Sequence, residues 1–119
     1  MAKKKTVAKN AAKKKATKRL SEVMKPSGMT LEEWQVALRQ QAAMSENFGI
    51  EPIDEELSPG EYWVRNPRTH WRYKVVYRGA DSVWNYCSCL DFKTSQLGTC
   101  KHLEAVKNKI SNSRKMRVH

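Results

Sequence analysis

Residues 85–106 read NYCSCLDFKTSQLGTCKHLEAV, a stretch that contains all three cysteines of the chain and one of its three histidines. Four side chains follow the order C-x-C, ten residues, C-x-H, at Cys87, Cys89, Cys100 and His102. Three thiolates and one imidazole complete the tetrahedral shell of a structural zinc site and leave no position open for a substrate. The spacing therefore predicts one bound Zn²⁺ with a structural role.

The local sequence indicates how the two ligand pairs are presented. Cys87 and Cys89 belong to a strand-like segment, and side chains two apart on a strand share a face. Cys100 and His102 precede a helical pattern over residues 103–110. Because positions two apart on a helix do not face each other, we expect Cys100 in the turn before that helix and His102 in its first turn.

Two motifs, N-Y-C-S-C-L-D-F at residues 85–92 and G-T-C-K-H-L-E-A-V at residues 98–106, resemble a SWIM-type zinc finger. A wider stretch, residues 29–110, is similar to the region ahead of the motor in some bacterial Swi/Snf-type helicases, including T-L-E-E-W-Q-V-A-L-R-Q-Q at residues 30–41. The resemblance implies a ββα zinc module that binds DNA or proteins, here without the motor domain.

Other interpretations of the three cysteines are weaker. A lone buried cysteine is common in protein cores, but four ligand-type residues in this order, with no cysteine left over, favour a metal. Three cysteines cannot all form disulfides, and the N-terminus lacks the apolar segment of a secretory signal.

The net charge of +11 is unevenly distributed along the chain. Residues 1–25 carry ten Lys/Arg and one Glu, residues 26–61 carry one Arg and eight acids, and residues 62–119 carry twelve Lys/Arg and three acids. The Lys/Ala-rich start has almost no large apolar residues, so we expect it to be disordered when free. Its cations are suited to neutralising nucleic-acid phosphates; a solubilising tail is the alternative.

The chain divides into five expected segments. They are a disordered basic tail at 1–25, a helix segment at 26–48, an acidic linker at 49–60, the SWIM-type zinc-finger domain at 61–112 and a basic C-terminal tail at 113–119. The predicted fold class is α+β: a small zinc-stapled domain with an antiparallel β-meander and a ββα finger, preceded by one helix and the tail.

A capping box, Thr30 followed by Glu33, predicts a helix over about residues 31–46, with Trp34 anchoring it to the sheet of the finger. Strands are predicted over 61–65, 70–78 and 83–89. Alternation in the middle strand places one set of side chains in the core, namely Trp71, Tyr73, Val75 and Tyr77. The opposite face becomes a basic ridge that includes Arg72, Lys74 and Arg78.

Seven of the ten aromatic residues lie within residues 62–86, interleaved with Arg and Lys. Such rings can stack on single-stranded bases, but a domain of this size also needs them for its core. We favour a core role for Trp71, Tyr73 and Tyr77, and leave Trp63, Trp84 and Tyr86 open.

Two remaining polar positions bear on the metal. Asp91, between the ligand pairs, is expected to form a turn or to hydrogen-bond a ligand. His70 and His119 are not expected to bind metal, because neither has a cysteine beside it.

No P-loop or catalytic triad is evident, so we expect no enzyme activity and no small-molecule substrate. Two function classes remain: a module that binds nucleic acid, with DNA preferred over RNA, and an adaptor that docks a helicase or DNA-repair partner. The charged tail favours the first. The expected contacts are Lys3, Lys4, Lys5, Lys13, Lys14, Lys15, Lys18, Arg19, Arg72, Lys74 and Arg78.

The chain has no run of 18 apolar residues and no secretory signal. We therefore expect a cytoplasmic protein without membrane contact, which would associate with the nucleoid in a bacterium or enter the nucleus in a eukaryote.

Overall fold

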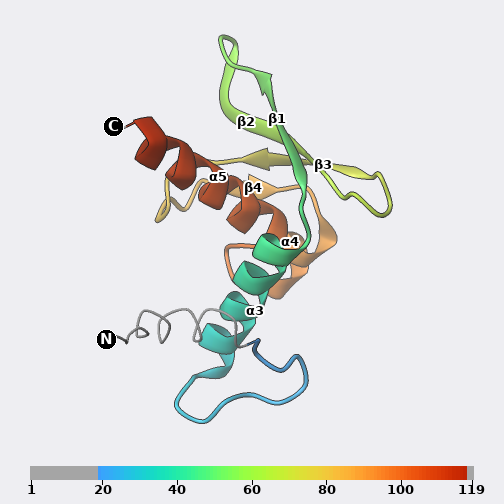
Figure 1. Cartoon of the computed structure of the whole chain (residues 1–119), viewed down its shortest axis with the longest axis vertical. Coiled ribbons are helices and arrows are strands. Elements are labelled where there is room, and N and C mark those ends of the chain that lie inside the picture. The colour runs from blue at the N-terminus through green and yellow to red at the C-terminus, as the bar shows by residue number, and fades with distance from the viewer. Residues whose placement is uncertain (1–18, 118–119) are drawn as a thin grey trace, which may run out of the picture.

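The computed structural model describes residues 19–117, with side chains up to residue 113. The elements, numbered as in Figure 1, follow the order α3, β1, β2, β3, β4, α4, α5. Their bounds are Leu31–Ser45 for α3, Gly49–Asp54 for β1, Ser58–Arg65 for β2, Arg72–Val76 for β3, Tyr86–Cys87 for β4, Leu90–Ser95 for α4 and Lys101–Arg117 for α5. The four strands form one antiparallel sheet in sequence order, so the α+β class is confirmed.

Helix α3 begins at the predicted capping box. The Glu33 amide donates to Thr30 Oγ1 at 3.0 Å, and the Thr30 amide donates to Glu33 Oε1 at 2.9 Å. These two reciprocal bonds satisfy amides that a helix start otherwise leaves without partners. The helix ends at Ser45, one residue before the predicted end.

The chain before α3 folds back onto this helix. The buried Trp34 indole donates to the Ser21 carbonyl at 3.0 Å. The Leu20 amide donates to Gln41 Oε1 at 2.8 Å, so residues 20–21 lie against α3. Residues 20–21, within the segment expected as the tail 1–25, therefore pack on α3. Residues 1–18, which make up most of the predicted tail, lie outside the described part of the chain.

The segment predicted as an acidic linker, residues 49–60, instead forms β1 and the start of β2. Ile50 pairs with Val64 across this hairpin, and Ile50 packs against the buried core. The turn is closed by Asp54 Oδ1, which accepts from the amides of Glu56 and Leu57 at 3.0 Å each. The acidic composition indicated a linker because Glu51 and Asp54 occupy exposed positions of β1, whereas Ile50 and Ile53 are partly buried.

The other strands are shorter than predicted. The middle strand covers residues 72–76 rather than 70–78, and the last covers residues 86–87 rather than 83–89. Trp71, predicted in the core, is 67% exposed. It lies just outside the ladder, where its carbonyl accepts from the Asn66 amide at 2.9 Å. Val75 is fully buried, and Tyr73 and Tyr77 pack against the core as predicted.

One face of the sheet packs on α5, and Val64, Val75 and Val106 form the centre of that contact. Helix α3 packs mainly on α5 rather than on the sheet, which corrects the predicted docking. The two helices meet where α3 ends and α5 begins, and Lys101 Nζ pairs there with Glu46 Oε1 at 2.9 Å (Figure 1). No helix within residues 19–117 is long and apolar enough to span a membrane.

Candidate metal centre

The structure brings the four predicted ligands together. Cys87 ends β4, Cys89 caps the N-terminus of α4, Cys100 immediately precedes α5 and His102 lies in its first turn. All four side chains are buried, and their ligand atoms lie within 4.8 Å of one another. The prediction for Cys100 and His102 is confirmed. Cys89 reaches the cluster from a helix cap rather than from a strand, because the short helix α4 begins directly after it.

The spacing of the ligand atoms matches zinc. His102 Nδ1 lies 3.7 Å from Cys87 Sγ and 3.9 Å from Cys100 Sγ. A tetrahedral zinc ion with ordinary bond lengths places its sulfur and nitrogen ligands about 3.6 Å apart, within a few tenths of an ångström of both distances. The four residues therefore fit one tetrahedral metal ion, for which zinc is the typical occupant of a Cys₃His set.

The thiols are arranged so that a cation is needed to ionise all three. Hydrogen bonds to Cys100 and Cys89, together with burial, raise the pKa of Cys87. Hydrogen bonds from Cys100 and Cys87 lower the pKa of Cys89. The two pKa values move in opposite directions because buried thiolates this close repel one another, so the thiols do not ionise together without a cation. A divalent cation removes this conflict, because it stabilises every thiolate at once.

Backbone amides at two helix starts also favour sulfur anions. The Phe92 amide donates to Cys89 Sγ at 3.4 Å, and the Leu103 amide donates to Cys100 Sγ at 3.5 Å. Free amides at a helix N-terminus stabilise nearby negative charge. The N-termini of α4 and α5 therefore stabilise the thiolate forms of Cys89 and Cys100, which are the forms that bind a metal.

Aromatic rings hold His102 in place. Its imidazole stacks on Tyr73 with ring centroids 4.4 Å apart, and the Phe48 ring meets it edge-on at 5.1 Å. Nδ1 faces the sulfurs, whereas Nε2 is buried without a hydrogen-bond partner among the described residues. A ligating histidine usually donates its second N–H to an oxygen; here the ring is oriented by packing.

Arg39 of α3 was missed by sequence reasoning and lies beside the cluster. Its guanidinium donates to both carboxylate oxygens of Asp91, at 2.7 and 3.0 Å. The hydrogen bond to Asp91 raises the pKa of Arg39 despite burial, and the charges of Cys100 and Cys89 raise it further. Asp91 thus binds Arg39 rather than a metal ligand. The two residues are 52 positions apart, so no local pattern links them.

The predicted basic ridge is partly neutralised. Lys74 Nζ lies 3.2 Å and Arg78 Nη2 lies 3.6 Å from the Glu61 carboxylate. Arg72 instead places its guanidinium carbon 4.2 Å from the centre of the Trp63 ring. Arg19 is exposed, and its Nη2 lies 4.0 Å from Glu22 Oε2.

The remaining predicted positions do not join the metal cluster. His70 is exposed in a turn with a φ of 66°. The lysines Lys3 to Lys18 and His119 lie outside the described part of the chain. Nucleic-acid contacts by the tail and the ridge therefore stay a prediction.

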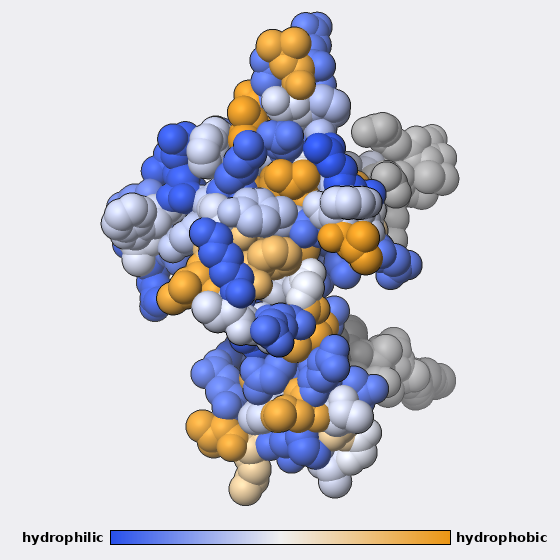
Figure 2. All heavy atoms as spheres, turned by 180° about the vertical axis from the view of Figure 1, so that it is seen from behind, coloured by the Kyte–Doolittle hydropathy of each residue, from blue (hydrophilic) through white to orange (hydrophobic). Residues whose placement is uncertain are grey.

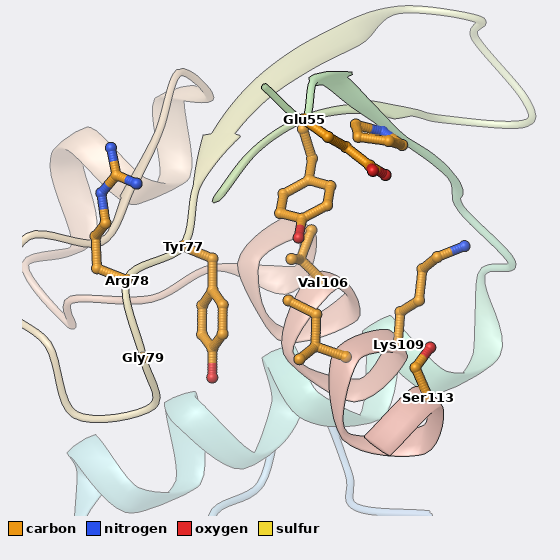
Figure 3. A pocket seen from close by; sticks show the side chains of 10 residues that line it. Glu55, Tyr77, Arg78, Gly79, Val106, Lys109 and Ser113 are labelled. Carbon is orange, nitrogen blue, oxygen red and sulfur yellow. The ribbon is translucent and has the colours of Figure 1, made fainter. Parts of the chain in front are cut away.

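A separate cavity of about 580 Å³ lies between the β1–β2 hairpin, the loop after β3 and α5 (Figure 3). Tyr77 and Val106 line it, while Arg78 points away from both. A second hollow of about 560 Å³ borders the metal ligands Cys89, Cys100 and His102. Of these two hollows, only the second touches the candidate metal centre.

No protein-family model, curated protein or solved structure matched the chain. The resemblance to a SWIM-type finger therefore rests on the sequence motif alone, whereas the geometry of the cluster supports a zinc-finger-like metal site.

Proposed function

We propose that this chain is a zinc-stabilised module of the SWIM type that binds nucleic acid, largely through phosphate contacts. The carrying observation is the buried Cys₃His cluster, whose four ligand atoms lie within 4.8 Å of one another. Four protein ligands fill a tetrahedron, so the ion stabilises structure and does not activate a substrate.

The size of the core supports a structural role for the metal. The largest fully buried side chains are Val64, Val75, Val106, Cys87 and Cys100, so two of these five are ligands. Small domains commonly need a metal or disulfide beyond their apolar core. The ion would join β4, α4 and α5, and α5 in turn covers the sheet.

The charge distribution supports a polyanionic ligand. Within the described residues, Arg65, Arg68 and Arg72 form no ion pair with a carboxylate. Residues 1–18 add eight lysines and no acid. Each phosphate contact releases counterions, which gives strong, salt-sensitive and largely sequence-independent binding.

An adaptor role is the second candidate. Val83 and Trp84, in the loop ahead of β4, are 87% and 76% exposed. Adjacent exposed apolar side chains are common at protein-interaction sites. This function would explain the loop but not the lysine-rich start of the chain.

Titration of zinc-loaded protein with DNA at several salt concentrations tests the proposal. We expect a linear fall of log affinity with log salt, with a slope of about −0.9 for each phosphate contact on duplex DNA. Deleting residues 1–18 should flatten this slope by several units. This deletion spares the contacts of Leu20 and Ser21 with α3. A matched control replaces the same lysines with glutamine and keeps the chain length.

Two results separate the candidates. Equal slopes for the intact and shortened proteins would exclude the tail from binding. No affinity for DNA or RNA at low salt would contradict nucleic-acid binding and favour the adaptor.

A further inference from the structure

The β2–β3 hairpin ends in a group of cations and indole rings that we name the hairpin end: Trp63, Arg65, Arg68, Trp71 and Arg72. Trp63, Arg65 and Arg72 lie on the face of the sheet opposite to the one that packs on α5, since Val64 and Tyr73 point to the core. Figure 2 shows the molecule from behind, where hydrophilic and intermediate residues cover most of the surface around scattered hydrophobic ones.

Two arginines of the hairpin end face each other. Arg65 and Arg72 are directly opposite partners in the β2–β3 ladder, and both are exposed. Like charges at opposite positions destabilise a sheet. Residues 62–80 contain five cations and no acid, so Arg68 in the turn adds to the same field. Arg65 Nη1 donates to the His70 carbonyl at 3.3 Å, and neither Arg65 nor Arg72 pairs with a carboxylate among the described residues, so both charges remain available to an anionic ligand.

Two indole rings belong to the hairpin end. Trp71, immediately before β3, is 67% exposed, and strand alternation places it on the face opposite to Arg72. Arg72 lies over the Trp63 ring at 4.2 Å, which holds its guanidinium next to the indole. Indole rings and guanidinium planes are both surfaces on which unpaired bases stack.

Hydrogen bonds make the turn rigid before any ligand arrives. Asn66 Oδ1 accepts from the amides of Arg68 at 2.8 Å and Thr69 at 3.2 Å. The Asn66 carbonyl accepts from the His70 amide at 2.8 Å, and the Asn66 amide donates to the Trp71 carbonyl at 2.9 Å. A preorganised turn loses less conformational entropy on binding.

We propose that the hairpin end binds single-stranded nucleic acid. One unpaired base stacks on Trp71 and another on the Arg72–Trp63 pair as the strand passes around the end of the hairpin, and Arg65 and Arg68 contact the flanking phosphates. Bases within a duplex are already stacked on each other, so these surfaces select the single strand. This proposal rests on the proposed function and adds the site and the form of the nucleic acid.

Glu51 provides an internal check on the site. It lies opposite Trp63 in the β1–β2 ladder and borders a small depression of about 50 Å³ beside Arg65 and Arg72. A carboxylate here repels a phosphate. Glu51→Gln should therefore strengthen single-strand binding.

The test measures the anisotropy of labelled oligothymidine, oligouridine and a DNA duplex with the full-length, zinc-loaded protein. Trp71→Ala should weaken single-strand binding roughly 5- to 100-fold, the range for loss of one stacked base. Duplex binding should change by less than about twofold, because it depends on phosphate contacts. Trp84→Ala is the matched control, since Trp84 is similarly exposed but lies in the loop after β3. Trp71→Tyr should restore most of the affinity.

The outcomes are distinguishable. Duplex and single strands bound equally well, with Trp71→Ala no different from Trp84→Ala, would overturn this proposal and leave the proposed function standing. No binding to any oligonucleotide would overturn both. A matching loss for Trp84→Ala would move stacking away from the hairpin end and reject the site. The ratio of thymidine to uridine affinity identifies whether DNA or RNA is preferred.

Discussion

Between residues 86 and 106, a two-residue strand and two helix starts meet at four buried ligands, whereas between residues 49 and 76 three strands pair along a hydrogen-bonded ladder. We call these the ligand half and the strand half. In the ligand half, the buried side chains include three thiols and an imidazole, which need a cation to be stable as ligands. In the strand half, backbone pairing and valine burial supply the stability, which leaves the outward side chains free for binding. The comparison assigns stabilisation of the fold by a metal to the ligand half, and contact with a partner to the exposed side chains of the strand half.

Removal of the metal is expected to have the largest effect. Chelation, or Cys89→Ser or His102→Ala, should unfold the segment around residues 83–110, because structural zinc contributes about 10 to 16 kcal/mol in small zinc domains. Amide hydrogen exchange should show loss of protection there first, with weaker protection in β1 and β2. Unchanged amide dispersion after chelation would show that the ligand half is stable without a metal.

Truncation of the valine core is expected to cost less. Val64 of β2 is fully buried on the face of the sheet that packs on α5. Val64→Ala should lower the free energy of unfolding by roughly 2 kcal/mol, through lost burial and a small cavity. Denaturant unfolding of the zinc-loaded protein measures this cost. Val76→Ala, at a less buried position of β3, is the matched control and should cost less.

Separation of α3 from the ligand half is expected to have a smaller effect. Arg39→Gln should destabilise the protein by about 1 kcal/mol, because the ion pair with Asp91 is partly exposed and water screens it. Loss of the guanidinium should also weaken zinc binding, since three thiolates with one Zn²⁺ carry a net negative charge. A double-mutant cycle with Asp91→Asn isolates the pair. Additive costs would show that the two side chains are not coupled.

Removal of an exposed ring in the strand half is expected to have the smallest effect on stability. Trp71→Ala should change the free energy of unfolding by less than about 0.5 kcal/mol, the usual range for exposed positions. Thermal unfolding in the presence of zinc provides the measurement. A larger loss of unfolding free energy would mean that the Trp71 ring supports the hairpin. Weaker single-strand binding by the Trp71→Ala variant would then reflect a damaged hairpin and not a lost stacking contact.

Sequence reasoning was most successful where a rule is local. The ligand set follows from residue type and spacing, and Thr30 with Glu33 predicts the helix start because the capping box spans only four residues. It failed where tertiary context decides. Strand β1 carries Pro52 and acidic residues that read as a linker, and only its pairing with β2 reveals a strand. Helix α4 is too short to show a periodic pattern.

Long-range contacts were beyond sequence reasoning for a different reason. The pairing of Arg39 with Asp91 joins two segments that share no pattern. The exposure of Trp71 depends on where the ladder ends, and alternation alone does not specify that point. Boundaries of elements and distant ion pairs are both set by packing.

The four ligands lie within residues 87–102, so they are close in the chain as well as in space. Closing a short loop costs little entropy, and contacts of low sequence separation form early in folding. We therefore expect the Cys₃His cluster to assemble around its metal before α3 docks, because the Arg39–Asp91 contact must close a separation of 52 residues. Pulse-labelled hydrogen exchange during refolding with zinc should protect α5 before α3; the reverse order would contradict this pathway. A chain emerging from the ribosome could accordingly capture its metal as soon as His102 is free.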